Sequence, residues 1–180
     1  MVNPQESVNH SIKNDHKTIE QTMEKLSGGT RRLAAQLTTS ASFDSLWDVL
    51  TDYDRLSLYI PNLLLSKKIY QKNNNVHLKQ VGAQDFLGMK FSAEVTIDLF
   101  EEKELGLIKF NLIKGDFRKF EGSWKIQKIQ NTLKHSLIYE LTVQGCQWMP
   151  IGMIERRLKK DLSENLIAVD RQAKSSTDLF

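Results

Sequence analysis

A single long amphipathic helix towards the end of the sequence limits the folds open to this chain. Pro150 suits the first turn of a helix, and the apolar residues after it recur at helical spacing over about five turns. These residues are Ile151, Ile154, Leu158, Leu162, Leu166 and Val169. A helix with one apolar stripe is stable only when that stripe is covered. The rest of the chain therefore has to supply a matching apolar surface.

Seven segments ahead of this helix have the pattern of strands. The clearest is residues 89–101, in which apolar and polar residues alternate, so one face is buried and the other faces water. The others are 32–39, 63–71, 76–86, 107–113, 117–130 and 133–145, separated by turn-forming residues such as Asn73, Gly88 and Gly106. Neighbouring strands joined by short turns predict a meandering antiparallel sheet.

Two short helical segments are predicted after the first of these strands. Residues 42–50 have apolar side chains at helical spacing, and Ser42 is a good N-cap. A second segment covers residues 53–59, and Pro61 ends it. The predicted fold class is therefore α+β: a curved seven-stranded antiparallel sheet wrapped around the long C-terminal helix.

Composition indicates a globular protein of one domain. The 180 residues are 40% hydrophobic, and no apolar run approaches the roughly 20 residues of a membrane span. Cys146 is the single cysteine, which excludes an internal disulfide and a cysteine-based zinc site. A lone thiol fits a reducing compartment, so we expect a cytoplasmic protein. The formal net charge of +3 is too small to indicate nucleic acid as a partner.

The first 29 residues differ from the rest, because they contain no aromatic side chain and end in two glycines. They have no apolar stretch of a secretory signal. We expect a flexible tail at 1–29, with a short helix at 15–26 and Gly28-Gly29 as a hinge. The folded domain is predicted at 30–174, with a C-terminal tail at 175–180.

Several motifs resemble those of the START-like (SRPBCC) superfamily, in the branch labelled polyketide cyclase/dehydrase and coenzyme Q-binding. Residues 115–124 (GDFRKFEGSW) are similar to its G-x-F-R-x-F/Y-x-G-x-W strand. Residues 43–53 and 59–62 resemble its first helix and turn, and 150–168 its final helix. The resemblance implies a helix-grip fold with a hydrophobic cavity between sheet and helix. Most members bind or carry lipids, isoprenoids, sterols or polyketides, and some catalyse cyclisation or dehydration.

A strongly curved sheet that closes on one helix leaves space between them, which predicts a ligand cavity. By strand parity and helix spacing, its lining would be Phe91, Val95, Ile97, Phe120, Trp124, Leu137, Tyr139, Leu141, Ile154, Leu158 and Leu162. Plain core packing is the alternative for each of them. Residues predicted at the cavity mouth, as a gate or a lip that touches a membrane, are Leu64, Trp148, Met149 and Met153.

No catalytic residue is assigned from the sequence. His135 and Tyr139 are the two candidates on the apolar side of the last strand, and Asp116 and Arg118 are candidates for the cavity rim. The alternatives are that His135 is a partly exposed turn residue and that the Tyr139 hydroxyl hydrogen-bonds only to a neighbouring backbone group. For Asp116 and Arg118 the alternative is an ion pair at the end of a hairpin. Histidine and glutamate pairs at metal-binding spacing do not occur, so neither a metal nor a cofactor is expected.

Four lysines, at positions 67, 68, 72 and 79, occur with no acid between Ser66 and Gln80. They indicate either a solvated face or contact with anionic lipid, so the protein is expected to be cytoplasmic or peripheral to a membrane.

The first functional hypothesis is binding or transport of an apolar small molecule. The second is an enzyme of the cyclase/dehydratase kind. The third is a protein-interaction module like the START-like toxins that associate with ribosomes, using these lysines and the basic residues at 156–160.

Overall fold

The computed structural model describes residues 7–14, 17–86, 89–146, 149 and 151–177. The strands are β1 (Ser7–Asn14), β2 (Lys17–Lys25), β3 (Arg31–Thr39), β4 (Leu63–Lys72), β5 (Asn75–Phe86), β6 (Met89–Glu102), β7 (Leu107–Gly115), β8 (Phe117–Lys128) and β9 (His135–Gly145). The helices are α1 (Phe43–Thr51) and α2 (Ile151–Thr177), with short 3-10 helices η1 (Ser27–Gly29), η2 (Tyr53–Leu58) and η3 (Lys103–Leu105).

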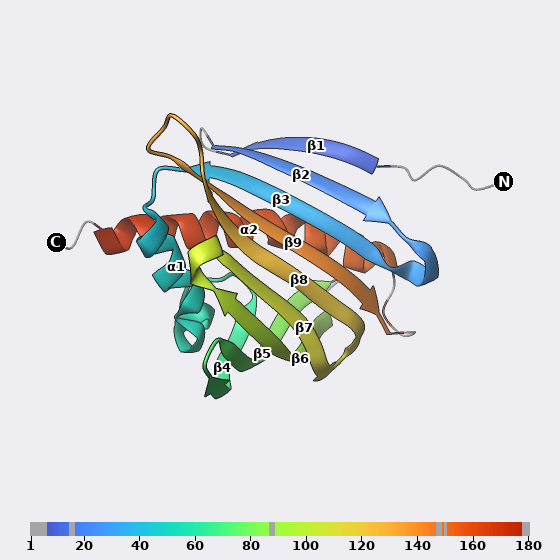
Figure 1. Ribbon diagram of the computed structural model, residues 1–180. Helices are drawn as coiled ribbons and strands as arrows, with labels where there is room; N and C mark the ends of the chain where they lie inside the picture. The colour runs from blue at the N-terminus through green and yellow to red at the C-terminus, as the bar shows by residue number, and fades with distance from the viewer. Residues whose placement is uncertain (1–6, 15–16, 87–88, 147–148, 150, 178–180) are drawn as a thin grey trace.

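All nine strands belong to one antiparallel sheet in the order β1-β2-β3-β9-β8-β7-β6-β5-β4. From the β4 edge the strands follow one another as a meander to β9, which pairs with β3. The helix α2 crosses one face of this curved sheet (Figure 1). The α+β helix-grip class and the seven predicted strands are confirmed, as are the two short helical segments after the first of them.

The sheet has nine strands rather than the predicted seven, because two more precede β3. The helix expected at 15–26 is wrong: Lys17–Lys25 is strand β2, which pairs with β3. Ile19 and Met23 are four residues apart, and this spacing places them on one side of either a helix or a strand. In the structure both are buried, as is Gln21 between them. The sheet therefore extends N-terminal to residue 30, where the domain boundary was predicted.

The helix α1 forms where its cap residue and its apolar spacing agree. The hydroxyl of Ser42 accepts a hydrogen bond from the backbone N–H of Ser45 at 3.1 Å, as an N-cap does. Leu46, Trp47 and Leu50 of α1 are buried. This short helix packs against α2 at one end of the sheet, and so closes that end of the core.

The helix α2 packs mainly on α1 and on strands β2, β3 and β9. Polar contacts from β2 and β3 hold its first half to the sheet. The side-chain amide of Gln21 donates to the backbone carbonyl of Lys159 at 2.8 Å, and Arg31 pairs with Glu155 at 2.6 Å. One helix is narrower than nine strands, so the β4–β8 part of the sheet curves past it and space remains between them.

Candidate functional site: an apolar cavity with a polar stripe

A cavity of about 300 Å³ lies between the sheet and α2. Its walls come from α1, η2, the strands β4 to β9, and α2. Most lining side chains are apolar, and the residues from β6 to β9 include Val95, Ile97, Leu99, Ile108, Phe110, Phe117, Phe120, Trp124, Tyr139 and Leu141. Leu50, Leu56, Ile60 and Leu63 line it from α1 to the start of β4, and strand parity in the sheet did not identify them.

Most residues that the sequence predicted for a cavity do line this one. They are Phe91, Val95, Ile97, Phe120, Trp124, Tyr139, Leu141, Leu158 and Leu162. Leu137 is an exception, because it is fully buried but does not line the cavity. It pairs with Leu37 and Ile126, which are also buried, so side chains fill the space at this level of the sheet. The side chain of Ile154 lies outside the described residues.

The residues predicted at the mouth have different outcomes. Met149 lines the cavity and is 8% exposed. Leu64 does not line it and is 66% exposed, because the strand register shifts between Leu63 and Leu65 and turns Leu63 inward instead. Trp148 and the side chain of Met153 lie outside the described residues.

Aromatic rings form one wall of the cavity. The rings of Trp124 and Tyr139 stack with centroids 4.0 Å apart and an angle of 5° between their planes. Phe120 contacts both Phe110 and Phe117, at 5.6 and 5.4 Å between centroids. Burial, and to a lesser extent the charge of Asp161, raises the pKa of the Tyr139 hydroxyl above its ordinary value. Tyr139 is therefore a neutral hydrogen-bonding group near Asp161.

A polar stripe on α2, made of Arg157, Asp161 and Asn165, also lines the cavity. The four-residue spacing places the three side chains on one side of the helix. The Nε of Arg157 donates to Oδ2 of Asp161 at 2.7 Å. Burial raises the pKa of the Asp161 carboxyl to about 6, against the opposing effect of the Arg157 charge. Sequence reasoning missed this stripe, because charged residues beside an apolar stripe are usually solvated.

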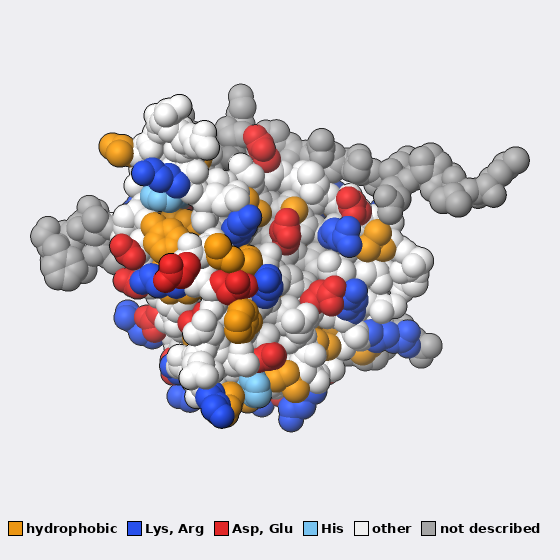
Figure 2. All heavy atoms as spheres, viewed as in Figure 1, with side chains coloured by type: hydrophobic (Ala, Val, Ile, Leu, Met, Phe, Trp, Pro, Cys, Tyr) orange, Lys and Arg blue, Asp and Glu red, His pale blue; other side chains and the backbone are white. Residues whose placement is uncertain are grey.

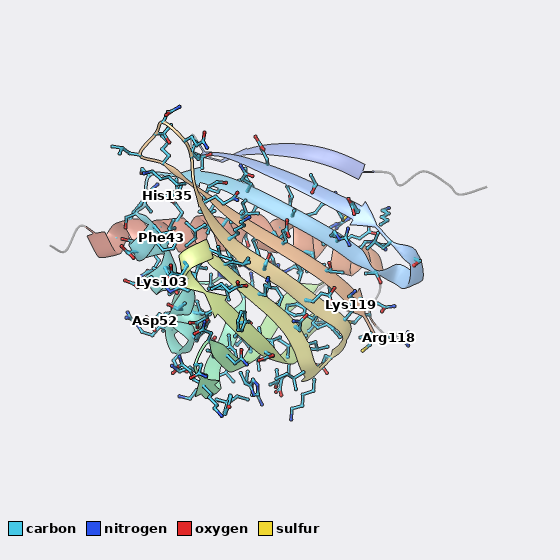
Figure 3. All side chains as sticks on the ribbon, viewed as in Figure 1. Phe43, Asp52, Lys103, Arg118, Lys119 and His135 are labelled. Carbon is cyan, nitrogen blue, oxygen red and sulfur yellow. The ribbon has the colours of Figure 1, made fainter. Side chains whose placement is uncertain are left out.

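The other catalytic candidate lies away from the cavity. Nδ1 of His135 is 3.0 Å from the backbone carbonyl oxygen of Ala41, and His135 does not line the cavity. Figure 3 shows His135 at the α1 end of the sheet, beside Phe43. His77 pairs with Asp98 at 3.5 Å on β5 and β6. Of the two predicted candidates, the structure thus places only Tyr139 in the cavity wall.

Two glycines and one aspartate explain why the 115–124 motif needs its residue types. Gly115 has φ of 152°, and a Cβ there would be 2.3 Å from the Glu94 carbonyl oxygen. A Cβ on Gly122 would be 2.0 Å from the carbonyl oxygen of Glu140. The Asp116 carboxylate accepts a hydrogen bond from the Glu94 backbone N–H at 2.7 Å. Asp116 therefore fastens the β7–β8 turn to β6 and is not a lining residue.

The basic residues singled out in the sequence are partly paired with acids from other segments. Lys67 is 3.8 Å from Asp54, and Lys79 is 2.9 Å from Glu94. The viewed face of the sheet carries both signs of charge among hydrophobic side chains (Figure 2). On α2, Arg157 faces the cavity, so the basic residues at 156–160 do not form one continuous surface.

Within the described ranges, no helix combines the length and hydropathy needed to cross a membrane.

The comparisons with known proteins agree on this architecture. Residues 39–170 match the family described as polyketide cyclase / dehydrase and lipid transport. The fold resembles the STAR-related lipid transfer protein of Xanthomonas axonopodis (TM-score 0.77, 11% identity), with 92% of this chain and 98% of that one covered. The Zhui aromatase/cyclase of Streptomyces sp. R1128 has a TM-score of 0.69 at 14% identity, with 81% and 94% covered.

Human StAR-related lipid transfer protein 5 has a TM-score of 0.69 at 7% identity, covering 94% of this chain and 88% of that one. A search of curated protein sequences gives no match. At these identities the structural likenesses establish the fold, and the family match covers most of the chain. This chain therefore belongs to the polyketide cyclase/dehydrase and lipid transport family of the START-like superfamily.

Proposed function

We propose that the chain binds and carries an apolar small molecule, such as a lipid, an isoprenoid or a quinone, without transforming it. The main observation in support of this proposal is the cavity of about 300 Å³, whose walls are mostly aliphatic and aromatic. Apolar ligand surface that leaves water contributes about 25 cal/mol per Å² before the costs of association. Two proteins of similar fold are named as lipid transfer proteins, which supports carriage.

The test is mass spectrometry of protein purified without detergent, under conditions that preserve complexes. We expect a bound apolar molecule that is released on denaturation. In the variant Ala93→Phe, a ring fills part of the cavity, because Ala93 lines it from β6. The matched control is Ala34→Phe, since Ala34 is half-buried in β3 and does not line the cavity. Repeated absence of a ligand, or equal retention in the two variants, would contradict the proposal.

A second candidate function is cyclisation or dehydration of the bound molecule, and it is Asp161 that favours it. A carboxyl with a pKa of about 6 in a cavity exchanges protons close to neutral pH, as a general acid or base must. Tyr139, whose hydroxyl is neutral, lines the same cavity. The ligand mass distinguishes carriage from dehydration, and the chromatographic retention of the released ligand distinguishes carriage from cyclisation, which does not change the mass. Under dehydration, Asp161→Asn retains a molecule heavier by one water than wild type, whereas under carriage both retain the same molecule.

We also propose that the protein is cytoplasmic and exchanges its ligand at an anionic membrane surface. Exposed apolar side chains flank the β4 edge: Leu58 is 73% exposed, and Leu64 is 66% exposed next to the lining residue Leu63. Lys67 and Lys68 on the same strand are exposed. Apolar side chains that insert and cations that meet lipid phosphates act together at such a surface.

Co-sedimentation with vesicles tests this contact. We expect binding to vesicles that contain phosphatidylglycerol and weaker binding to phosphatidylcholine alone. The double variant Leu58→Ser, Leu64→Ser should bind less. Leu133→Ser is the control, because Leu133 is 92% exposed in the β8–β9 turn, distant from β4 in the sheet order. Equal binding by all three proteins would contradict a role for the β4 edge.

A further inference from the structure

The polar stripe is an exception in a cavity that is otherwise mostly apolar. Arg157, Asp161 and Asn165 occupy successive turns of α2 and line the cavity together. The side chains of Arg157 and Asp161 are 15% and 25% exposed, so both are largely withdrawn from water. A helix that only had to close an apolar core would carry apolar residues at these positions. The stripe therefore requires an explanation beyond packing.

Each residue of the stripe has one buried polar atom without a hydrogen-bond partner in the described part of the chain. These atoms are Nη2 of Arg157, Oδ1 of Asp161 and Oδ1 of Asn165. A buried polar group that stays unpaired is costly, so native proteins usually satisfy it with protein, water or ligand. The unused set is one donor and two acceptors. A group that both donates and accepts a hydrogen bond complements this set.

We propose that the polar end of the ligand is a neutral hydroxyl group held by Arg157, Asp161 and Asn165, with the apolar body against the aromatic wall. This inference rests on the proposed binding function and names the class of ligand. The hydroxyl accepts from Nη2 of Arg157 and donates to Oδ1 of Asp161 or Asn165. Small reorientations of these side chains bring the unpaired atoms to the ligand.

The charges of the stripe favour a neutral group over an anionic one. The Arg157 guanidinium is already paired with the Asp161 carboxylate at 2.7 Å, so the pair offers little net positive charge. A ligand carboxylate beside Asp161 would lie next to a like charge in a poorly solvated site. An ether or a hydrocarbon cannot donate a hydrogen bond, so it would leave the two acceptor atoms unpaired.

The experiment compares two isomers that differ in hydrogen bonding. Octan-1-ol and 1-methoxyheptane have the same composition, but only the alcohol donates a hydrogen bond. Each displaces the neutral fluorophore N-phenyl-1-naphthylamine from the full-length protein, and octanoate is the anionic comparison. We expect the alcohol to bind about tenfold more tightly than the ether, and octanoate to bind more weakly than the alcohol.

Two variants assign the preference to the stripe. Asn165→Leu keeps a side chain of similar size but removes the amide, so the preference for alcohol over ether should shrink while both still bind. Asn111→Leu is the matched control, because it makes the same substitution at an exposed position of β7 that does not line the cavity. It should keep the full preference. Thermal unfolding of both variants shows that they fold.

The outcomes separate this inference from the proposed function. If no probe displaces the fluorophore from wild type, the binding function itself fails. If alcohol and ether bind equally, or if octanoate binds more tightly than the alcohol, the cavity binds ligands but the hydroxyl assignment is wrong. If Asn165→Leu and Asn111→Leu change the preference to the same extent, the stripe does not provide it.

Discussion

At the scale of single residues, Asp161 makes stability depend on pH in an unusual direction. Its pKa in the folded protein is about 6 rather than 3.8, mainly because burial disfavours the charged form. Arg157, Lys160 and Glu164 on α2 and Tyr139 on β9 also act on it. Between these two pH values the folded state holds a proton that the unfolded state has lost. The contribution of Asp161 to stability therefore falls as pH rises through this window.

We predict that the free energy of unfolding of wild type, minus that of Asp161→Asn, falls by on the order of 2 kcal/mol from about pH 4 to about pH 7. Urea unfolding at several pH values measures it. Glu104→Gln is the control, because Glu104 is exposed in η3 and the corresponding difference should stay nearly flat. A difference for Asp161→Asn that stays constant or rises over this range would refute the prediction.

The apolar lining could be predicted from the sequence better than the polar stripe. Val95 and Ile97 were assigned by strand parity, which holds wherever one sheet face is buried. Leu137 shares that parity but lies where the core is filled, and parity gives no information about depth along a strand. Arg157 was predicted only as one of the basic residues at 156–160 that could contact a partner, because nothing in a helical pattern shows that a sheet curves around that side. The type and spacing of side chains therefore predict which face of a strand or helix is buried, but they do not predict where along that face a cavity remains.

At the scale of elements, β2 provides part of the core rather than a tail. Ile19 is fully buried and Met23 is 4% exposed. We predict that Ile19→Ala lowers the free energy of unfolding by about 2–4 kcal/mol, since it removes buried methyl groups and leaves a cavity. Glu20→Ala, at the exposed neighbouring position, should change it by less than about 0.5 kcal/mol. Urea unfolding compares the two, and equal small effects would mean that β2 contributes little.

The strand β2 was missed for a physical reason. Its apolar residues Ile19 and Met23 are spaced by four, which fits a helix face as well as a strand face. What selects the strand is pairing with β3, from Ile19 opposite Leu37 to Lys25 opposite Arg31. Such pairing is a long-range contact, and local propensity alone does not reveal it.

The C-terminal half of α2 depends on Asp170. This side chain is fully buried, accepts a hydrogen bond from the Thr39 hydroxyl of β3 and pairs with Lys174 at 3.0 Å. We predict that Asp170→Ala lowers the free energy of unfolding by about 3–5 kcal/mol, because buried partners are left unpaired. Lys174→Ala should cost less, since Lys174 is 37% exposed. Chemical denaturation measures the free energy of unfolding of both variants. If the two variants lose the same stability, the buried contacts of Asp170 are not the cause of the loss.

At the scale of the whole molecule, polar contacts hold α2 at both ends while the middle borders a void. Arg31 with Glu155 holds the first half, and Asp170 with Thr39 holds the second. Between them, Leu158 and Leu162 line the cavity. Because these contacts hold both ends of α2, the helix does not collapse onto strands β6–β8, and the cavity stays open. The capacity of that void then determines the size of the ligand.

This capacity predicts how affinity depends on chain length in a series of primary alcohols. Each added methylene buried in the cavity should tighten binding about fourfold, which corresponds to about 0.8 kcal/mol, until the cavity is full. Beyond that length affinity should level off, because further methylenes stay in water. In Ala93→Phe the plateau should begin at a shorter alcohol, and in Ala34→Phe at the wild-type length. Fluorophore displacement measures the series. A plateau at the same length in all three proteins would show that the alcohols bind elsewhere than in this cavity.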